Sequence, residues 1–184
     1  MGIREQWISL LHRAATGTKK TRTLLTPIGV TIFGAFTALF VIAALWVDRL
    51  LNLPSLLPEG ARFPVSIPVM AVGIAVTAWS AFHFLRVKGT PVPFNLPPEV
   101  VTTGPYRYAR NPMLTGVFLF LFGLGIAVDS LSLVLFFTPL FIVINVWELK
   151  EIEEPELVKR FGDEYIEYQR RTPMFIPRLG RARS

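Results

Sequence analysis

Two stretches of the sequence concentrate side chains that could hold and orient a charged small molecule. The first, TTGPYRYARNPMLTG (102–116), places Arg107 and Arg110 three residues apart, directly before a long apolar run. The planar guanidinium group offers paired N–H donors that match a carboxylate. The stretch therefore predicts a ligand-binding loop or, if both arginines bind lipid phosphates, an anchor at a membrane surface.

The second stretch, ELKEIEEPELVKRFGDEYIEYQRR (148–171), is rich in acidic side chains. Five glutamates lie close together at its start: Glu148, Glu151, Glu153, Glu154 and Glu156. A carboxylate can accept a proton from a nucleophile or face a cationic ligand. A solvated helix surface would have the same composition, so the residues alone leave the two interpretations open.

Metal and thiol chemistry are not indicated. The sequence contains no cysteine, and its two histidines, His12 and His83, lie far apart along the chain. Thiolate ligands, disulfides and thiol nucleophiles are thereby excluded. His83 belongs to an apolar run, where it could anchor a membrane interface or line a cavity.

The elements that position these stretches are expected to be membrane-spanning helices. The chain is 52% hydrophobic and 17% charged, and its apolar runs cover 24–47, 63–85, 113–128 and 131–147. The first two exceed the ~20 residues that a spanning helix needs, whereas the last two are short and suit a helical hairpin. The sequence predicts an all-α, polytopic membrane bundle of about four transmembrane helices.

Residues 1–184 are expected to form a single membrane domain with three parts. Segment 1–23 is predicted to lie in the cytoplasmic interface. Segment 24–147 forms the four-span bundle, whose loop 88–112 contains six prolines and cannot be a continuous helix. Segment 148–184 is expected to complete a site on the same side.

Local signals predict the shape of this C-terminal segment. Pro155 is expected to end or kink the helix that continues from the fourth apolar run. Leu157, Phe161 and Tyr165 then recur every four residues, which indicates one cytoplasmic helix with an apolar stripe. The outer loop 48–64 is expected to cap the bundle without chemistry of its own.

The distribution of basic residues predicts the orientation of the chain. With both termini in the cytoplasm, only Arg49 and Arg62 of the 19 basic residues lie on the outer side. The net charge of +6 then reflects topology and attraction to anionic lipid, not nucleic-acid binding. A long polar stretch precedes the first apolar run, so no secretory signal is expected. We predict an integral protein of a bacterial-type inner or plasma membrane.

Both polar stretches resemble one family of membrane enzymes. TGPYRYARNPMLTG followed by EEPELVKRFGDEYIEYQRRTPMFIPR is similar to the isoprenylcysteine carboxyl methyltransferases and the related phospholipid methyltransferases. Their pattern is a Gly-x-Tyr-Arg-x-x-Arg-His-Pro-x-Tyr-x-Gly segment, a glutamate pair and Phe-Gly-x-x-Tyr-x-x-Tyr. The matching residues are Gly104, Tyr106, Arg107, Arg110, Pro112, Gly116, Glu153, Glu154, Phe161, Gly162, Tyr165 and Tyr168.

The resemblance implies S-adenosylmethionine as the cofactor, held in a cavity at the cytoplasmic face. It implies that the catalytic residues are Glu153, Arg110 and Arg107. It further implies a cofactor enclosure made by Tyr106, Asn111, Pro112, Gly116, Glu148, Glu154, Tyr165 and Tyr168, with no metal. Its acceptor would be a lipid or a prenylated small molecule that arrives through the membrane.

Three departures from the family pattern bear on the acceptor. Asn111 stands where the motif has histidine, and Leu114 where it has tyrosine. Leu149 occupies the position at which the prenylcysteine enzymes carry arginine, which weakens the case for a prenylcysteine carboxylate. A carboxylate, an amine or a hydroxyl acceptor stays open.

Two other functions remain as alternatives. Membrane sterol reductases that use NADPH share a similar C-terminal layout, but they have glutamate where this chain has Val117 after Gly116. A non-enzymatic membrane protein could also retain the fold. Binding of S-adenosylmethionine or of NADPH would distinguish the three.

Overall fold

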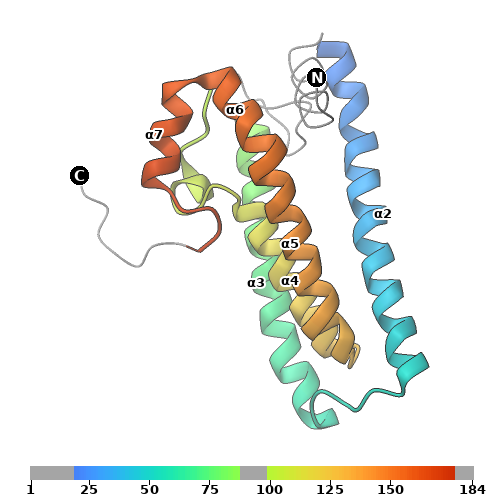
Figure 1. Cartoon of the computed structure of the whole chain (residues 1–184). Coiled ribbons are helices and arrows are strands. Elements are labelled where there is room, and N and C mark those ends of the chain that lie inside the picture. Colours follow the sequence, from blue (N-terminus) through green and yellow to red (C-terminus); the bar gives the residue numbers. More distant parts are fainter. Residues whose placement is uncertain (1–18, 88–98, 177–184) are drawn as a thin grey trace.

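The computed structural model describes residues 19–87 and 99–176, and these residues form helices and loops without strands (Figure 1). The expected all-α membrane bundle is confirmed. The predicted interfacial segment falls mostly on residues 1–18, and the first part of the proline-rich loop on residues 88–98. Both lie outside the described residues, as do residues 177–184.

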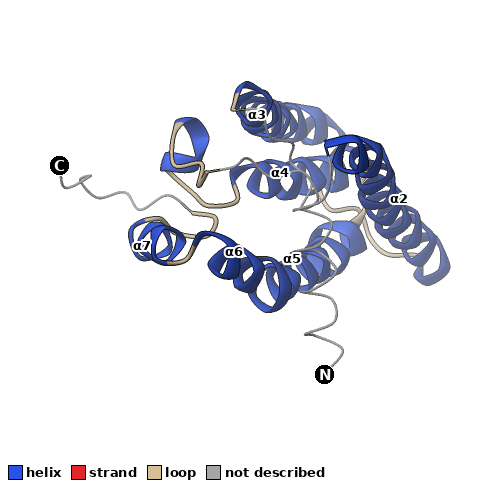
Figure 2. Cartoon of the chain, turned by 90° about the horizontal axis from the view of Figure 1, so that it is seen from above, coloured by secondary structure: helices blue, strands red, loops and turns tan. Residues whose placement is uncertain are grey.

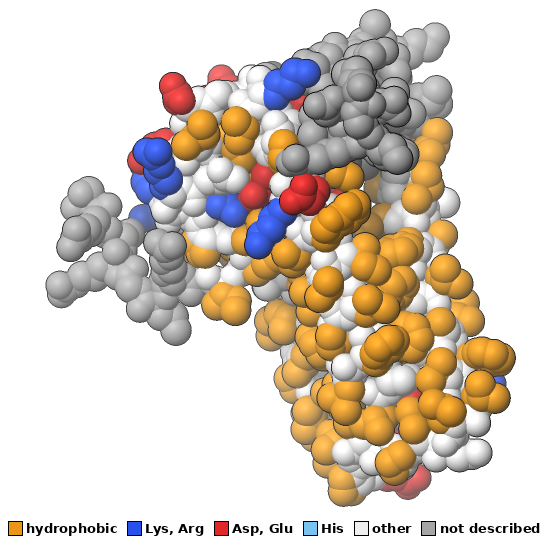
Figure 3. Space-filling view, in the orientation of Figure 1, with side chains coloured by type: hydrophobic (Ala, Val, Ile, Leu, Met, Phe, Trp, Pro, Cys, Tyr) orange, Lys and Arg blue, Asp and Glu red, His pale blue; other side chains and the backbone are white. Residues whose placement is uncertain are grey.

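Three helices are long and apolar enough to cross a membrane. They cover Pro27–Leu51, Glu59–Arg86 and Leu133–Phe161. The first belongs to α2 (Lys19–Leu51) and the second is α3 (Glu59–Arg86), whereas α4 (Pro112–Ala127) is apolar but shorter. Hydrophobic side chains cover the long part of the bundle, and most charged side chains visible on this face gather at one end (Figure 3).

The fourth apolar run forms a longer helix than expected. α5 (Thr138–Glu148) is flanked by two π-helical turns, η2 (Leu133–Phe137) and η3 (Leu149–Glu153), and continues into α6 (Glu154–Phe161). The helix therefore runs through Pro155. In η3 the Glu154 N–H bonds to the carbonyl of Leu149, five residues back. This wider turn spaces the proline ring from the carbonyl that it would meet in a regular α-helix.

The prediction of a single C-terminal helix is wrong. α6 ends at Phe161, and a second helix, α7 (Asp163–Arg171), begins after Gly162. Gly162 has a φ of +60°, a conformation that glycine adopts without the penalty a side chain would incur. Leu157 and Tyr165 therefore lie on different helices, and the turn folds α7 back beside α6 at one end of the bundle (Figures 1 and 2).

Helices α3 and α4 pack against each other through glycines. A Cβ added to Gly116 would lie 2.6 Å from the Gly73 carbonyl oxygen, and one added to Gly73 would lie 2.6 Å from the Phe120 nitrogen. Small residues let two membrane helices approach to backbone contact. This contact fixes α3 beside α4, as Figure 2 shows from above.

The end of the bundle opposite α6 and α7 is held together by polar contacts. Asp48 of α2 bonds to the Ser130 hydroxyl and accepts a 3.0 Å hydrogen bond from the Ser132 backbone. Arg62 of α3 pairs with Asp129 at 2.6 Å. The loop between α2 and α3 thus takes part in a network that connects α2, α3 and the α4–α5 turn, which sequence reasoning did not anticipate.

Asp129 is the acidic centre of this network. Desolvation acts to raise the pKa of its carboxyl, but the Leu56 N–H, the Ser55 side chain and the nearby Arg62 outweigh it and hold the pKa below its ordinary value. Asp129 also has a φ of +56° at the turn. The charged form of Asp129 is therefore the one that the fold stabilises.

Candidate active site

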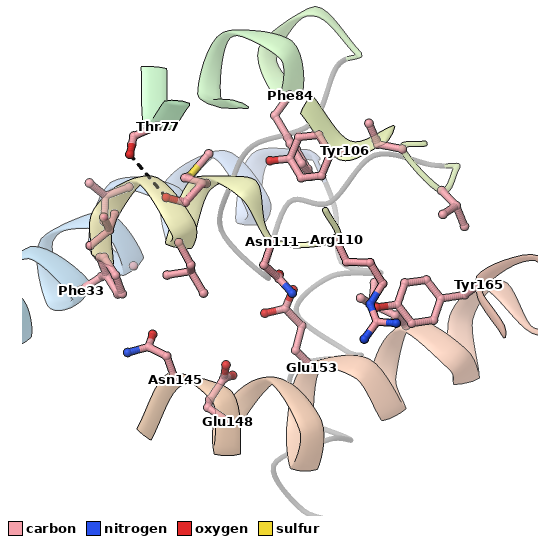
Figure 4. A pocket seen from close by; sticks show the side chains of 18 of the residues that line it. Phe33, Thr77, Phe84, Tyr106, Arg110, Asn111, Asn145, Glu148, Glu153 and Tyr165 are labelled. Carbon is pink, nitrogen blue, oxygen red and sulfur yellow. Dashed lines mark hydrogen bonds between the residues drawn. The ribbon is translucent and has the colours of Figure 1, made fainter. Parts of the chain in front are cut away.

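A cavity of about 640 Å³ lies at the end of the bundle where η1 (Gly104–Arg107), α6 and α7 meet. Its walls come from α2, α3, α4, the α5–α6 helix, α7 and the loop 99–111. This volume falls within the range of small-molecule sites. The two polar stretches of the sequence lie on opposite walls of this one cavity (Figure 4).

Most of the predicted site residues line the cavity. One wall carries Tyr106, Arg110 and Asn111, and the facing wall carries Glu148, Glu153, Tyr165 and Tyr168. In Figure 4, Asn111 and Glu153 point toward each other across the cavity. Tertiary folding thus brings together residues that lie some forty positions apart in the sequence.

The π-helical turn η3 explains how two glutamates of one helix come to face the cavity. Glu148 and Glu153 are five residues apart, which in a regular α-helix separates side chains by about 140°. In a π-turn, residues five apart are hydrogen-bonded partners and move toward the same face. Both carboxylates line the cavity as a result.

Arg110 is bound on several sides by the C-terminal segment. Its Nη2 lies 2.7 Å from Glu154 Oε1, and its Nη1 donates to the carbonyls of Gln169 at 3.0 Å and Thr172 at 3.3 Å. Both side chains of the ion pair are only 12% exposed. The charge of Arg110 is therefore largely satisfied by protein, and its main effect is to hold α6 and α7 against the loop.

Further contacts hold the C-terminal segment over the start of α4. The Tyr168 hydroxyl donates to the Tyr106 carbonyl at 2.7 Å, and the Asn111 N–H donates to the Met174 carbonyl at 2.9 Å. The Phe175 ring packs 5.4 Å from Phe118. The segment 172–175 thereby holds α7 against the start of α4, and its residues are not among those that line the cavity.

Three tyrosines in the cavity wall are poor acids. Burial raises the pKa of Tyr106, Tyr165 and Tyr168, and for Tyr106 and Tyr165 the charge of Glu153 adds to the effect. A phenol with a raised pKa stays protonated at neutral pH and serves as a hydrogen-bond donor. None of the three is suited to act as a base.

Four predicted site residues lie outside the cavity lining. Arg107 is exposed at the surface, and Glu154 is buried against Arg110. Pro112 starts α4, and Gly116 packs on α3. The structure places these four where they shape or support the site instead of facing its interior.

His83 also supports the wall from outside. Its Nε2 lies 2.9 Å from Thr103 Oγ1, and a Cβ on Gly104 would meet the His83 ring at 2.6 Å. Gly104 has a φ of +60°, so glycine is required there for both space and conformation. His83 thus positions the turn that carries Tyr106, and it is not among the cavity-lining residues.

Asn145 is a cavity residue that was not predicted. Its Nδ2 donates to the Phe141 carbonyl at 2.8 Å, and the side chain lines the cavity about one turn before Glu148. An amide at membrane depth is costly unless it has a partner, which makes it a candidate for function. The sequence signal was a lone asparagine in an apolar run, on the same helical face as Glu148.

Comparison with known proteins places the chain in a family. The profile described as phospholipid methyltransferase (PEMT) matches residues 62–164, more than half of the sequence. The chain belongs to this family of membrane methyltransferases. The match includes most of α3, all of α4 and the α5–α6 helix, and therefore the lining residues from Thr77 to Phe161.

One curated relative is the nickel-cobalt-cadmium resistance protein NccN of Alcaligenes xylosoxydans xylosoxydans. It is 36% identical over 106 residues, which is 58% of this chain and 45% of that protein. The alignment thus spans about half the length of this curated relative.

Proposed function

We propose that this protein transfers a methyl group from S-adenosylmethionine to a lipid or lipid-linked acceptor at the cytoplasmic face of a membrane. The observation that carries the proposal is one cavity with two halves. Its outer half has carboxylates and tyrosines, and its inner half lies among the apolar residues of the helices. Family membership supports methyl transfer.

The residues of the outer half fit a sulfonium cofactor. Among the described lining residues, Glu99, Glu148 and Glu153 are acidic, whereas Arg110 carries the one positive charge and is paired with Glu154. This predominance of carboxyl side chains favours a cationic ligand. The faces of Tyr106 and Tyr165 can add cation–π attraction.

Specific side chains would hold such a cofactor. Asn111 can hydrogen-bond its amino-acid or ribose groups, and the protonated tyrosines Tyr106 and Tyr165 can donate to its oxygens. The acidic Glu153, on the wall facing Asn111, is placed to attract the charged part. When bound, the cofactor supplies an electrophilic methyl group.

The chain's contribution to the reaction would be alignment, exclusion of water and control of one proton. Methyl transfer is an in-line displacement, so its rate depends on holding the nucleophile in line with the methyl group. The ion pair and hydrogen bonds of Arg110, which hold α6 and α7 against the loop, would help to keep water from the reacting centre. Glu153 would accept the proton that an amine or hydroxyl acceptor must lose.

The environment of the arginines bears on the acceptor class. A carboxylate acceptor needs no base but benefits from a cation that orients it. Arg110 is satisfied by Glu154 and two carbonyls, and Arg107 lies at the surface. This supports an amine or hydroxyl acceptor over a carboxylate.

The proposed orientation places the cavity end in the cytoplasm, where S-adenosylmethionine is available. It rests on the basic residues that flank the spans on that side. In this arrangement residues 1–184 act as one membrane domain, and the acceptor enters from the bilayer while the cofactor enters from water.

Ligand binding and turnover of the purified protein test the proposal. We expect saturable binding of radiolabelled S-adenosylmethionine and none of NADPH. Glu153→Gln should lower methyl transfer into a membrane lipid extract by about 10²–10⁴-fold, as loss of a general base does. Glu164→Gln, on the exposed side of α7, is the matched control and should retain full turnover.

Two results would contradict the proposal. Binding of NADPH without S-adenosylmethionine would indicate a reductase, and binding of neither would indicate a scaffold. Wild-type turnover by a folded Glu153→Gln variant would remove Glu153 from the reaction.

A further inference from the structure

The inner half of the cavity extends into the bundle beyond the polar residues. On α2 it extends from Gly29 to Phe36, and it is further lined by Leu114 and Val117 of α4 and Ile144 of α5. We propose that Phe36 forms the floor of this compartment and sets the length of the apolar chain that an acceptor can place there. This inference rests on the proposed function and adds to it a residue that determines specificity.

The order of residues along three helices shows which part of the cavity is deepest. α2 and α4 both run away from the cavity end, so their last lining residues, Phe36 and Val117, are their deepest. The α5–α6 helix runs toward that end, so its first lining residue, Ile144, is its deepest. These three residues come from three walls, and Phe36 and Val117 both pack against the buried cluster of Phe118, Leu121 and Phe141, which sets the level of the floor.

Below this level the bundle is filled by aromatic rings. The Phe36 ring stacks on Phe141 at 5.5 Å and lies 4.8 Å from the Phe40 ring. Phe141 is fully buried, Phe118 is nearly so, and neither lines the cavity. The compartment therefore ends on a packed cluster, and Phe36 is the member of the Phe36–Phe40–Phe141 group that faces the cavity.

The helical rise gives the depth of the compartment. From Gly29 to Phe36, the first and last lining residues of α2, seven steps of 1.5 Å amount to about 10 Å. An extended hydrocarbon chain advances about 1.3 Å per carbon, given its ~1.5 Å bonds. The compartment thus holds about eight carbons in line, which suits a medium-length acyl or isoprenoid chain.

A second path for the chain leads sideways between the helices and gives a different experimental result. Val30 and Ile32 line the cavity and are also 55% and 64% exposed on the outside of α2. A chain that left the cavity sideways past them would lie in the bilayer and would not touch Phe36. Chain-length selection would then be independent of the residue at position 36.

The test compares the products of three proteins in the same lipid mixture. Vesicles of a bacterial total lipid extract, supplemented with n-alkylamines and N-acetyl-S-prenylcysteines of graded length, are incubated with methyl-labelled S-adenosylmethionine. Mass spectrometry then gives the chain length of each labelled lipid. Phe36→Ala is compared with the wild type and with Phe40→Ala, which removes the same ring from the same cluster one turn away, outside the cavity lining.

We expect the wild type to favour chains of about eight carbons within each class of acceptor. Phe36→Ala should move the preferred length up by roughly three carbons, the span of the lost ring, and raise the long-to-short product ratio by about tenfold or more. Phe40→Ala should keep the wild-type preference. Phe36→Trp should move the preference toward shorter chains, and it keeps the test available if Phe36→Ala does not fold.

Each contrary result has its own meaning. Identical length preferences in the wild type and the Phe36 variants would overturn the role of Phe36 while leaving methyl transfer intact. A shift in Phe40→Ala as large as that in Phe36→Ala would also overturn it. No labelled lipid from the wild type would refute the proposed function itself, and the inference with it.

Discussion

The ion pair between Arg110 and Glu154 allows a quantitative test of how the cavity wall is held. Its two side chains are each 12% exposed and meet at 2.7 Å. Removing one partner of such a buried pair leaves an unpaired charge and costs about 3–5 kcal/mol. We therefore expect Arg110→Met and Glu154→Gln each to lower the free energy of unfolding by a few kcal/mol. The double variant should lose much less than the sum.

The chain contains a matched control in the exposed pair of Arg171 and Glu167. These side chains are 70% and 52% exposed and meet at 3.2 Å, one turn apart on α7. Exposed pairs at this spacing contribute about 0.3–0.5 kcal/mol. The two double-mutant cycles use the same chemical groups, so the difference in coupling energy reports the burial and the tertiary setting of the Arg110–Glu154 pair.

Denaturant unfolding in a mild detergent measures both cycles, and binding of S-adenosylmethionine by the folded variants gives a second readout. The Arg110 and Glu154 variants should bind the cofactor more weakly, because Arg110 connects the loop to α7, whereas the Arg171 and Glu167 variants should bind it as the wild type does. Equal coupling energies in the two cycles would refute the conclusion that Arg110 acts as a buried clamp. Unchanged cofactor binding by the Arg110 and Glu154 variants would show that this ion pair stabilises the fold without affecting the binding site.

Three further predictions concern the bundle. Gly116→Ala should destabilise the protein by about 1–3 kcal/mol through overpacking against α3, whereas Gly34→Ala, whose Cβ meets nothing within 4 Å, should be close to neutral; thermal unfolding of both variants decides. Asp129 has a lowered pKa in the folded state, so its contribution is present above its ordinary pKa and is lost as the pH falls through the folded value. Asp129→Asn should therefore flatten the acid limb of a stability–pH profile, and an unaltered limb would show that another group controls it. Leu157→Asp should impair folding, because Leu157 packs against Phe84 and Tyr106; a fully stable variant would show that this contact is dispensable.

Gly162 and Pro155 show why the helix boundaries in the C-terminal segment were difficult to predict from local sequence patterns. Gly162 ends α6 because of its backbone conformation, yet the i, i+4 recurrence of Leu157, Phe161 and Tyr165 indicated one helix across it. The three residues are all apolar or aromatic because they line the same cavity, although they belong to two helices. Pro155 was expected to interrupt a helix that a π-turn allows to continue.

The sequence by itself determined the class of molecule and the family. Long runs without charge can only be accommodated as helices in a bilayer, because backbone groups there must bond within the segment. The order and spacing of Arg107, Arg110, Glu153 and Glu154 indicated the family that the comparison then identified. These features depend on composition and local spacing, which are properties of the linear chain.

Only the tertiary structure showed which of the predicted residues line the cavity and which hold its walls in place. Arg110 and Glu154, expected at the reaction centre and the cofactor, bond to each other, and the π-turn brings Glu148 to the same wall as Glu153. The phenylalanine floor combines rings from α2 and α5 that lie about a hundred positions apart in the sequence. Such contacts depend on how each helix is rotated and packed. A shift of one residue in helical register changes them completely, and local sequence patterns do not specify that register.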